Sequence, residues 1–150
     1  MQMKDSQRIA ASKATVWAAL NDPDILRRCI PGCQSLELAS PTEMIATVVL
    51  KVGPVKATFN GKVTLSEIDA PNSYLITGEG AGGVAGFAKG GAKVRLEEES
   101  PNVTILHYET EAQIGGKLAQ LGARLIDSTS RKLAANFFDS FAVVVAPAAS

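Results

Sequence analysis

Three glycines, Gly78, Gly80 and Gly83, have the G-x-G-x-x-G spacing of loops that bind dinucleotides. In those loops a strand precedes the glycines and a helix follows them, so that the helix N-terminus meets the pyrophosphate. Here residues 84–99 alternate like a strand and open no helix, and no Gly-Lys-Ser or Gly-Lys-Thr occurs in the chain. The glycines therefore predict a hairpin tip or a bulge at the mouth of a sheet.

The two cysteines, Cys29 and Cys33, bracket Ile30-Pro31-Gly32. Zinc and redox pairs normally have C-x-x-C spacing with further Cys or His partners, and the chain has one histidine, His107. We therefore expect two reduced, partly buried thiols, no metal site and no cofactor.

His107 shares the polar face of a predicted strand with Glu109 and Glu111, because alternate residues of a strand lie on one face. A His–Glu pair is expected there, on a solvated edge. No Ser-His-Asp or Cys-His arrangement follows from the spacing, so no catalytic residue is predicted. Tyr108 lies on the opposite, inner face, where its phenol needs a hydrogen-bond partner. A ligand carbonyl, the backbone or water could supply that partner.

Alternation with a period of two runs from Cys33 to Ile114 and predicts antiparallel strands joined by short turns. We expect these strands over residues 34–39, 44–52, 55–66, 74–80, 88–96 and 105–114. Residues 3–10 predict an earlier strand. Between that strand and the others, Ser12 is a good N-cap for a helix over 13–20, and Asp22-Pro23 opens a second short helix over 24–30.

A long amphipathic helix is predicted from Gly115 to about Ala142, followed by Pro147. Its polar face carries Gln120, Arg124, Asp127 and Arg131, whose spacing allows ion pairs along the helix. Leucines fall on the opposite face: Leu118, Leu121, Leu125 and Leu133. Small or polar residues interrupt this apolar face: Gly122, Thr129 and Asn136. A helix with such gaps is typical of a cover over a space.

The strand positions facing this helix are unusually small: Ala46, Ala57, Gly61, Gly78, Gly90, Ala92 and Ala112. Glycine inside a strand often marks a bend. A sheet bent around a helix, with small residues on its inner face, leaves an apolar hollow. The alternative is that aromatic side chains fill the interior: Trp17, Phe59, Phe87 and Tyr108.

The chain has 150 residues and is 46% hydrophobic, which fits one domain with one core. We expect that domain over residues 1–145 and a short tail over 146–150. Fifteen basic and fifteen acidic residues give no net charge, which disfavours a nucleic-acid binder. No apolar segment resembles a secretory signal or a membrane span, so a cytoplasmic protein is predicted.

An aromatic cluster ends the predicted helix, with Phe137, Phe138 and Phe141 followed by Val143 to Val145. Phe138 continues the polar line of Arg124 and Arg131, so this line becomes apolar near the C-terminus. Such a cluster predicts contact with a partner, a membrane or a second copy. Packing against the first strand or the short helices explains it equally well.

Several passages, in this order, resemble the carbon monoxide dehydrogenase G-subunit family of the START-like, Bet v 1-like (SRPBCC) superfamily: ATVWAALNDPDIL, IPGCQSLE, VGPVKATFNGKV, GEGAGGVAGFAKGGAKVRLEE and GGKLAQLGARLIDSTSRKLAANFFDSF. The resemblance implies an α+β, helix-grip fold: a curved antiparallel sheet wrapped around a long C-terminal helix, with two short helices after the first strand. It also implies an accessory protein that serves a molybdenum-containing CO dehydrogenase. Its expected roles are recruiting that enzyme to the inner face of the membrane, through peripheral contact, or delivering a lipid-like or quinone-like ligand. Longer family members carry a membrane-seeking C-terminal tail.

The leading hypothesis is therefore a non-catalytic binder of a hydrophobic small molecule. We expect its cavity to be lined by Leu26, Ile30, Val48, Phe59, Val63, Ile76, Ala92, Tyr108, Leu121, Leu125 and Thr129. An alternative is a cyclase or aromatase of the same superfamily, for which Tyr108, Thr129 and Asn136 are the visible polar candidates. A ligand-free assembly or docking module is the third hypothesis.

Overall fold

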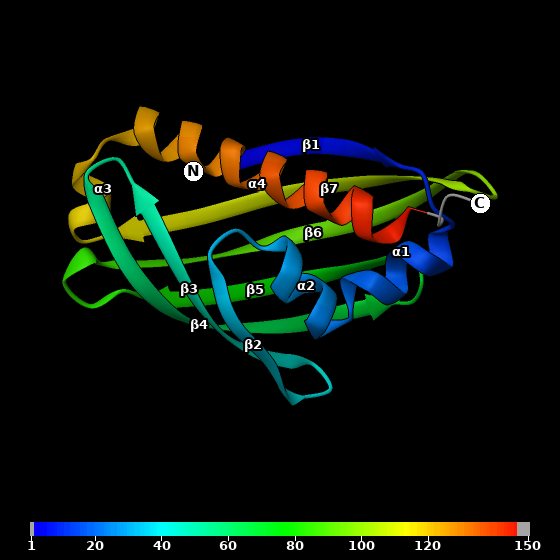
Figure 1. The fold of residues 1–150 in the computed structure, drawn as a ribbon, viewed down its shortest axis with the longest axis horizontal. Helices are drawn as coiled ribbons and strands as arrows, with labels where there is room; N and C mark the ends of the chain where they lie inside the picture. The colour runs from blue at the N-terminus through cyan, green and yellow to red at the C-terminus, as the bar shows by residue number, and fades with distance from the viewer. Residues whose placement is uncertain (1, 147–150) are drawn as a thin grey trace.

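The computed structural model describes residues 2–146, which form one curved antiparallel sheet with helices on its concave side (Figure 1). The strands are β1 (Gln2–Ile9), β2 (Cys33–Ser40), β3 (Glu43–Val52), β4 (Val55–Asp69), β5 (Ser73–Ala81), β6 (Phe87–Ser100) and β7 (Val103–Gly115). The helices are α1 (Lys13–Leu20), α2 (Pro23–Cys29), α3 (Lys117–Gln120) and α4 (Ala123–Val145), with a short 3-10 turn η1 (Gly83–Ala85). The α+β helix-grip prediction is confirmed.

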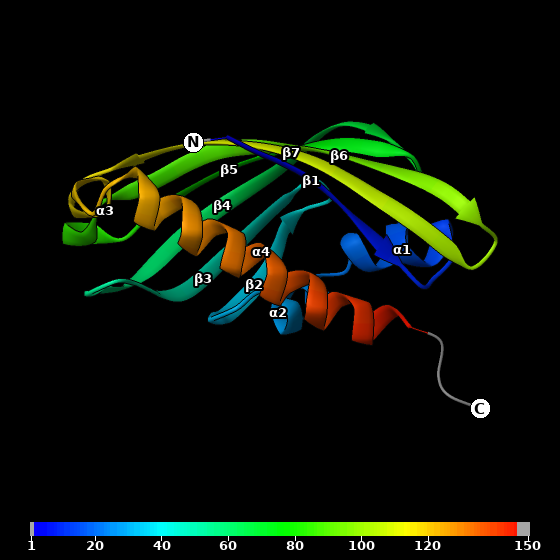
Figure 2. The same ribbon diagram turned by 90° about the horizontal axis from the view of Figure 1, so that it is seen from above.

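The strand order is β1-β7-β6-β5-β4-β3-β2, so each strand from β2 to β7 pairs with its neighbour in sequence, and β1 closes the far edge against β7. Figure 2 shows the sheet arching over α4, with α1 and α2 on the same side. Since helices cover only this side, the strands alternate between an inner face towards α4 and an outer face towards solvent. In register, the inner face pairs Val63 with Gly78, Gly78 with Gly90 and Gly90 with Ala112.

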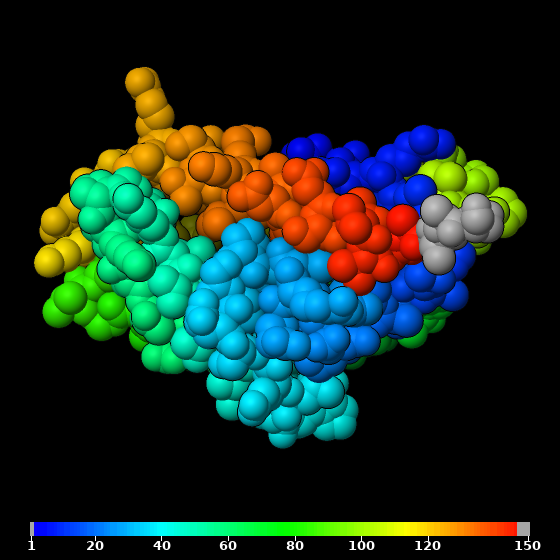
Figure 3. Space-filling view, in the orientation of Figure 1, coloured from blue at the N-terminus to red at the C-terminus, as the bar shows by residue number. Residues whose placement is uncertain are grey.

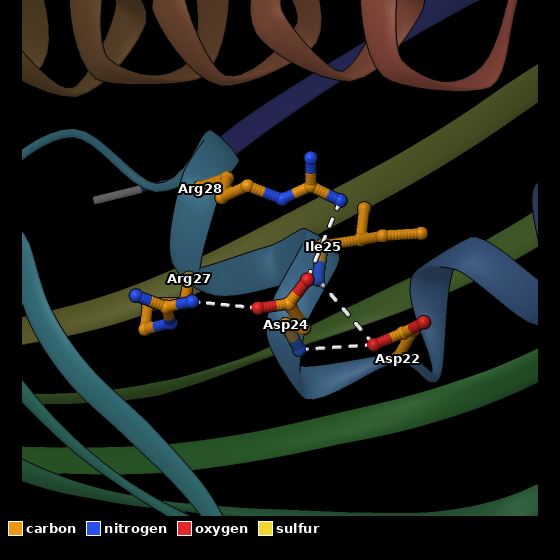
Figure 4. Close-up of polar contacts among 5 residues, drawn as sticks. All are labelled: Asp22, Asp24, Ile25, Arg27 and Arg28. Carbon is orange, nitrogen blue, oxygen red and sulfur yellow. Dashed lines mark hydrogen bonds and ion pairs between the residues drawn. The ribbon is translucent and has the colours of Figure 1, made fainter.

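The two short helices begin where side-chain caps allow them to begin. The Ser12 hydroxyl accepts a hydrogen bond from the Thr15 amide at 3.2 Å. The Asp22 carboxylate accepts one from the Asp24 amide at 2.9 Å, and Pro23 occupies the first turn of α2 (Figure 4). These contacts satisfy amides that a helix N-terminus leaves unpaired. The predicted ranges of both helices agree with the structure within one or two residues.

The terminal helix is not continuous, and the prediction of one helix from Gly115 is wrong in this respect. Gly122 has φ +95° and separates α3 from α4. Glycine adopts this conformation without the steric cost that other residues have, so the chain turns here. Gly122 and Asn136 are exposed, and of the three predicted gaps in the apolar face only Thr129 is half-buried. The predicted Asp127–Arg131 ion pair is present, at 3.0 Å.

The aromatic cluster of the terminal helix packs inward. Phe141 is fully buried, and Phe138 stacks on Tyr108 with ring centroids 5.3 Å apart. Placing Phe138 on the polar face was therefore wrong, and packing inside the molecule accounts for the three phenylalanines, whereas Val143 is 77% exposed. Of the predicted tail, only Ala146 is described; Pro147 and residues 148–150 lie outside the described residues.

Candidate functional site

The centre of the sheet forms a floor that carries almost no side chains, at Gly61, Gly78 and Gly80. A Cβ atom placed on Gly78 would meet only two atoms within 4 Å, the Lys62 carbonyl oxygen and Val63 Cγ2, both at 3.6 Å. On Gly80, the three nearest atoms would lie at 3.8 to 4.0 Å, and all belong to β4. No atom of α4 would lie closer than these at either position. The terminal helix therefore does not rest on the sheet here.

Two separate apolar clusters hold α4 away from this floor. The first joins α1, α2 and the C-terminal half of α4, and its most buried members include Val16 and Phe141. The second lies at the other end of the molecule, where Phe59, Ala85 and Leu118 are buried beside Leu125. Since each cluster fills one end, the small residues of the sheet lie between the two.

The part of α4 above this middle region carries mostly small or polar residues. Thr129, Ser130, Leu133 and Ala134 are half-buried, and none of them belongs to either cluster. Along α4, closely packed backbone contacts are made chiefly with α2 at one end and with α3 and β3 elsewhere. Glycine and alanine below, and threonine, serine and alanine above, leave Leu133 as the one bulky side chain among these residues.

One side of the region, between β1 and α4, is polar. Tyr108 is buried against Phe138 and lies near Asp5, Gln7 and Arg131. Burial raises the pKa of the Tyr108 phenol above its ordinary value; the negative charge of Asp5 raises this pKa further, whereas Arg131 and a hydrogen bond with Gln7 lower it. The phenol thus has a protein neighbour with which to hydrogen-bond, one of the alternatives left open by its position in the sequence. An amphiphile bound inside would meet its polar contacts along this seam.

Comparison with protein families gives a match over residues 6–146 to CoxG, the G-subunit family of carbon monoxide dehydrogenase. The chain belongs to this family. No curated protein sequence matches this CoxG-family chain.

Solved structures similar to this CoxG-family chain have the same architecture along its whole length. A conserved protein from Geobacillus kaustophilus is 28% identical, with a TM-score of 0.91 and coverage of 97% of this chain and 95% of that one. A START superfamily protein from Mycobacterium smegmatis is 11% identical, with a TM-score of 0.73 and 96% of each chain covered. The ZhuI aromatase/cyclase from Streptomyces sp. R1128 is 11% identical, with a TM-score of 0.68 and coverage of 97% and 93%. The two more distant structures show the fold alone.

The residues predicted to line a cavity fall into three groups. Those packed in or against the first cluster are Leu26, Ile30, Val48, Val63, Ile76 and Tyr108. Those in or against the second are Phe59, Leu121 and Leu125. Ala92 and Thr129 are half-buried and belong to neither. That these residues line one ligand cavity stays a prediction.

The aromatic side chains proposed to fill the interior do not occupy its middle. Phe87 is 47% exposed, and Trp17 packs edge-on against Tyr74 with ring centroids 5.2 Å apart. Phe59 and Tyr108 belong to opposite clusters. Tyr74, Phe137 and Phe138 are inward residues that the prediction of the cavity omitted. The period of two could have placed Tyr74 on the inner face, since it lies two residues before Ile76.

The other candidate groups lie away from this interior. His107 Nε2 is 2.8 Å from Glu97 Oε1 on the outer face, so its partner is on β6 and not on its own strand. The hydrogen bond from His107 lowers the pKa of Glu97. Cys29 is buried and Cys33 half-buried, both are free thiols, and desolvation raises both pKa values, which disfavours the reactive thiolate. Among residues 2–146, no His, Cys, Asp and Glu side chains are grouped to hold a metal ion.

The outer face of the sheet is also hollowed, which the sequence did not predict. An open groove of about 1040 Å³ crosses β1, β7, β6, β5 and β4 there. Thr64, Thr77 and Gly91 form part of its floor, and both lysines and glutamates surround it. This mixture of charges indicates no single ligand chemistry, whereas the inner region has a largely apolar surround.

Proposed function

We propose that this protein is a non-catalytic accessory protein that binds a hydrophobic, lipid-like or quinone-like molecule between α4 and the sheet. Residues 1–145 act as the ligand-binding domain. The protein serves a molybdenum-containing CO dehydrogenase-type enzyme, either by delivering an electron acceptor or by bringing the enzyme to the inner face of the cell membrane. Membership of the CoxG family supports the link to that enzyme.

The observation that carries the proposal is the bare floor at Gly78 and Gly80, where an added Cβ atom would meet no atom of α4 within ordinary contact distance. A sheet floor without side chains, between two packed apolar clusters, is a candidate site for an apolar ligand. The three polar candidates for a cyclase or aromatase differ in their surroundings: Tyr108 stacks on Phe138, Thr129 is half-buried on α4, and Asn136 is exposed. The non-catalytic function is therefore the better supported.

The test is to purify the full chain, extract it with organic solvent and identify any stoichiometric apolar molecule by mass spectrometry. Gly78→Leu places a large side chain on the inner floor and should remove the bound molecule. Thr77→Leu is the matched control, because Thr77 is the preceding residue on the outer face. If Thr77→Leu lost the ligand and Gly78→Leu kept it, the ligand would instead bind in the outer groove. A ligand-free extract, with tight binding to the dehydrogenase, would favour the docking module.

A further inference from the structure

The zero net charge of the chain conceals a separation of charge along the molecule. Residues 50–58, 80–91 and 112–126 contain five basic residues and no acidic residue. The five are Lys51, Lys56, Lys89, Lys117 and Arg124. All five are exposed, and none forms an ion pair within the part of the chain that the structure describes.

The fold brings these three segments to one end of the molecule. The turn between β3 and β4, the η1 loop and the turn that carries α3 lie together at the left of Figures 1 and 2. Glycines allow the close contacts: a Cβ on Gly53 would lie 2.8 Å from Leu125 Cδ2, and one on Gly86 would lie 1.9 Å from the Gly115 carbonyl oxygen. We call this surface the basic end.

Two of the cations repel each other across a hairpin. Lys51 and Lys56 are direct register partners on the outer face of β3 and β4. Like charges directly opposite each other destabilise a sheet, and a bound anion would relieve that cost. The N-terminus of α4, which has no side-chain cap, adds partial positive charge at the same end.

Apolar side chains project from the same end. Val84 is 84% exposed at the tip of the η1 loop, and Phe87, which is 47% exposed, covers Gly115. The opposite end of the sheet differs in charge: the last residues of β4 include Glu67 and Asp69, and those of β6 include Glu97 to Glu99. One end thus combines cations, of which Lys89 has an acidic register partner in Glu79, with exposed apolar groups, while five of the fifteen acids lie towards the other end.

We propose that the basic end docks on an anionic lipid surface, with Val84 inserted among the headgroups and the lysines against their phosphates. This inference rests on the proposed function, since a carrier of an apolar molecule must exchange it with a lipid phase. An apolar group framed by lysines and arginines is the combination that binds such a surface. A bilayer accommodates a narrow projection such as the η1 loop, whereas a protein partner would need a cleft shaped to it. Anionic lipid therefore fits better than an acidic protein.

The test measures flotation of the full chain with vesicles of phosphatidylcholine, with and without phosphatidylglycerol. We expect binding only to the anionic vesicles, weakened by salt. Each surface cation contributes about a fivefold change in affinity, so the double variant Lys51→Gln and Lys56→Gln should bind roughly 25-fold more weakly. Val84→Ser, which keeps every charge, should also weaken binding.

The matched control is Lys93→Gln with Arg95→Gln, which removes two exposed cations from the outer face of β6 outside the basic end. Equal loss of binding in both double variants would overturn the proposal, as would wild-type binding to neutral vesicles alone. Binding to neither vesicle, with a dehydrogenase interaction that needs Lys51 and Lys56, would assign the surface to a protein. If inorganic phosphate released the protein from anionic vesicles as readily as free lipid did, the basic end would be a simple anion-binding site.

The two proposals can fail separately. The double lysine variant should keep its extractable ligand, because Lys51 and Lys56 lie on the outer face. Vesicle binding through the basic end in a protein without a ligand would leave this inference standing and remove the carrier function. A protein that carries a stoichiometric ligand but does not bind vesicles would support the carrier function and overturn this inference.

Discussion

Positions 78 and 90 are register partners on the inner face, and each is occupied by glycine for a different physical reason. A Cβ on Gly78 has ordinary contacts, whereas one on Gly90 would lie 2.0 Å from the Glu111 carbonyl oxygen. Gly90 therefore permits the close approach of β6 and β7 as the sheet bends, and Gly78 keeps the floor clear of side chains.

This difference predicts opposite effects of the same substitution. Gly78→Ala should leave the free energy of unfolding unchanged or raise it by about 0.5 to 1 kcal/mol, because alanine loses less backbone entropy. Gly90→Ala should lower it by about 1 to 3 kcal/mol, because the backbone must shift. Urea unfolding of the two variants measures both values, and equal destabilisation would contradict the open floor.

Tyr74 predicts a dependence on alkaline pH. Burial raises the pKa of its phenol well above the ordinary value of 10.0. Above that pH the unfolded chain releases the proton while the folded chain keeps it, so the unfolded state binds fewer protons and stability falls as pH rises. The contribution is fully present below pH 10 and is lost as pH rises towards the raised value. Wild type should lose up to about 1.4 kcal/mol per pH unit more than Tyr74→Phe above pH 10, measured by urea unfolding. If the free energy of unfolding of wild type and of Tyr74→Phe fell equally with pH, burial of the Tyr74 phenol would not be the cause.

Among the elements, α2 fixes one end of the interior, because it packs against α4 and places Leu26 and its C-cap residue Ile30 against the first cluster. Figure 4 shows its first turn, where Asp22 accepts amide hydrogen bonds and Asp24 pairs with Arg27 at 2.6 Å and Arg28 at 3.4 Å. The Asp24 pairs lie in solvent, and the hydrogen bond from Arg27 lowers the pKa of Asp24.

The cap should matter more than the ion pairs. Asp22→Ala should destabilise the protein by about 1 kcal/mol, because two amides of α2 lose their acceptor. Asp24→Asn removes only exposed charge pairs and should cost less. Thermal unfolding of both variants compares them directly, and a larger loss for Asp24→Asn would refute this assignment.

At the scale of the whole molecule, α4 spans the concave side of the sheet and divides the interior between two clusters. The space-filling view in Figure 3 shows α4 and α2 in contact and closing one part of this face, beside the β3–β4 hairpin. A ligand held between the clusters would connect them and so stabilise the entire fold.

We expect the molecule recovered by extraction to raise the midpoint of thermal unfolding when it is added back. At a free concentration one hundredfold above its Kd, the gain is about 2.7 kcal/mol, or roughly 5 to 10 °C for a chain of this size. Gly78→Leu should lose the shift and Thr77→Leu should keep it. A shift that persists in Gly78→Leu would place the ligand elsewhere.

The order and type of the strands and of the two short helices follow from local sequence patterns. Strict alternation in β4 and the caps at Ser12 and Asp22 act locally, so the two short helices could be predicted within one or two residues and the strands within about four. The inner face of the sheet was equally predictable, because side chains in a strand alternate regardless of the rest of the fold.

The separation of α4 from the sheet and the inward packing of Phe138 on Tyr108 follow from tertiary packing. It alone gathered five distant cations at one end of a chain whose net charge is zero. These features depend on distances between segments far apart in the sequence, and the spacing of residues along the chain does not encode such distances.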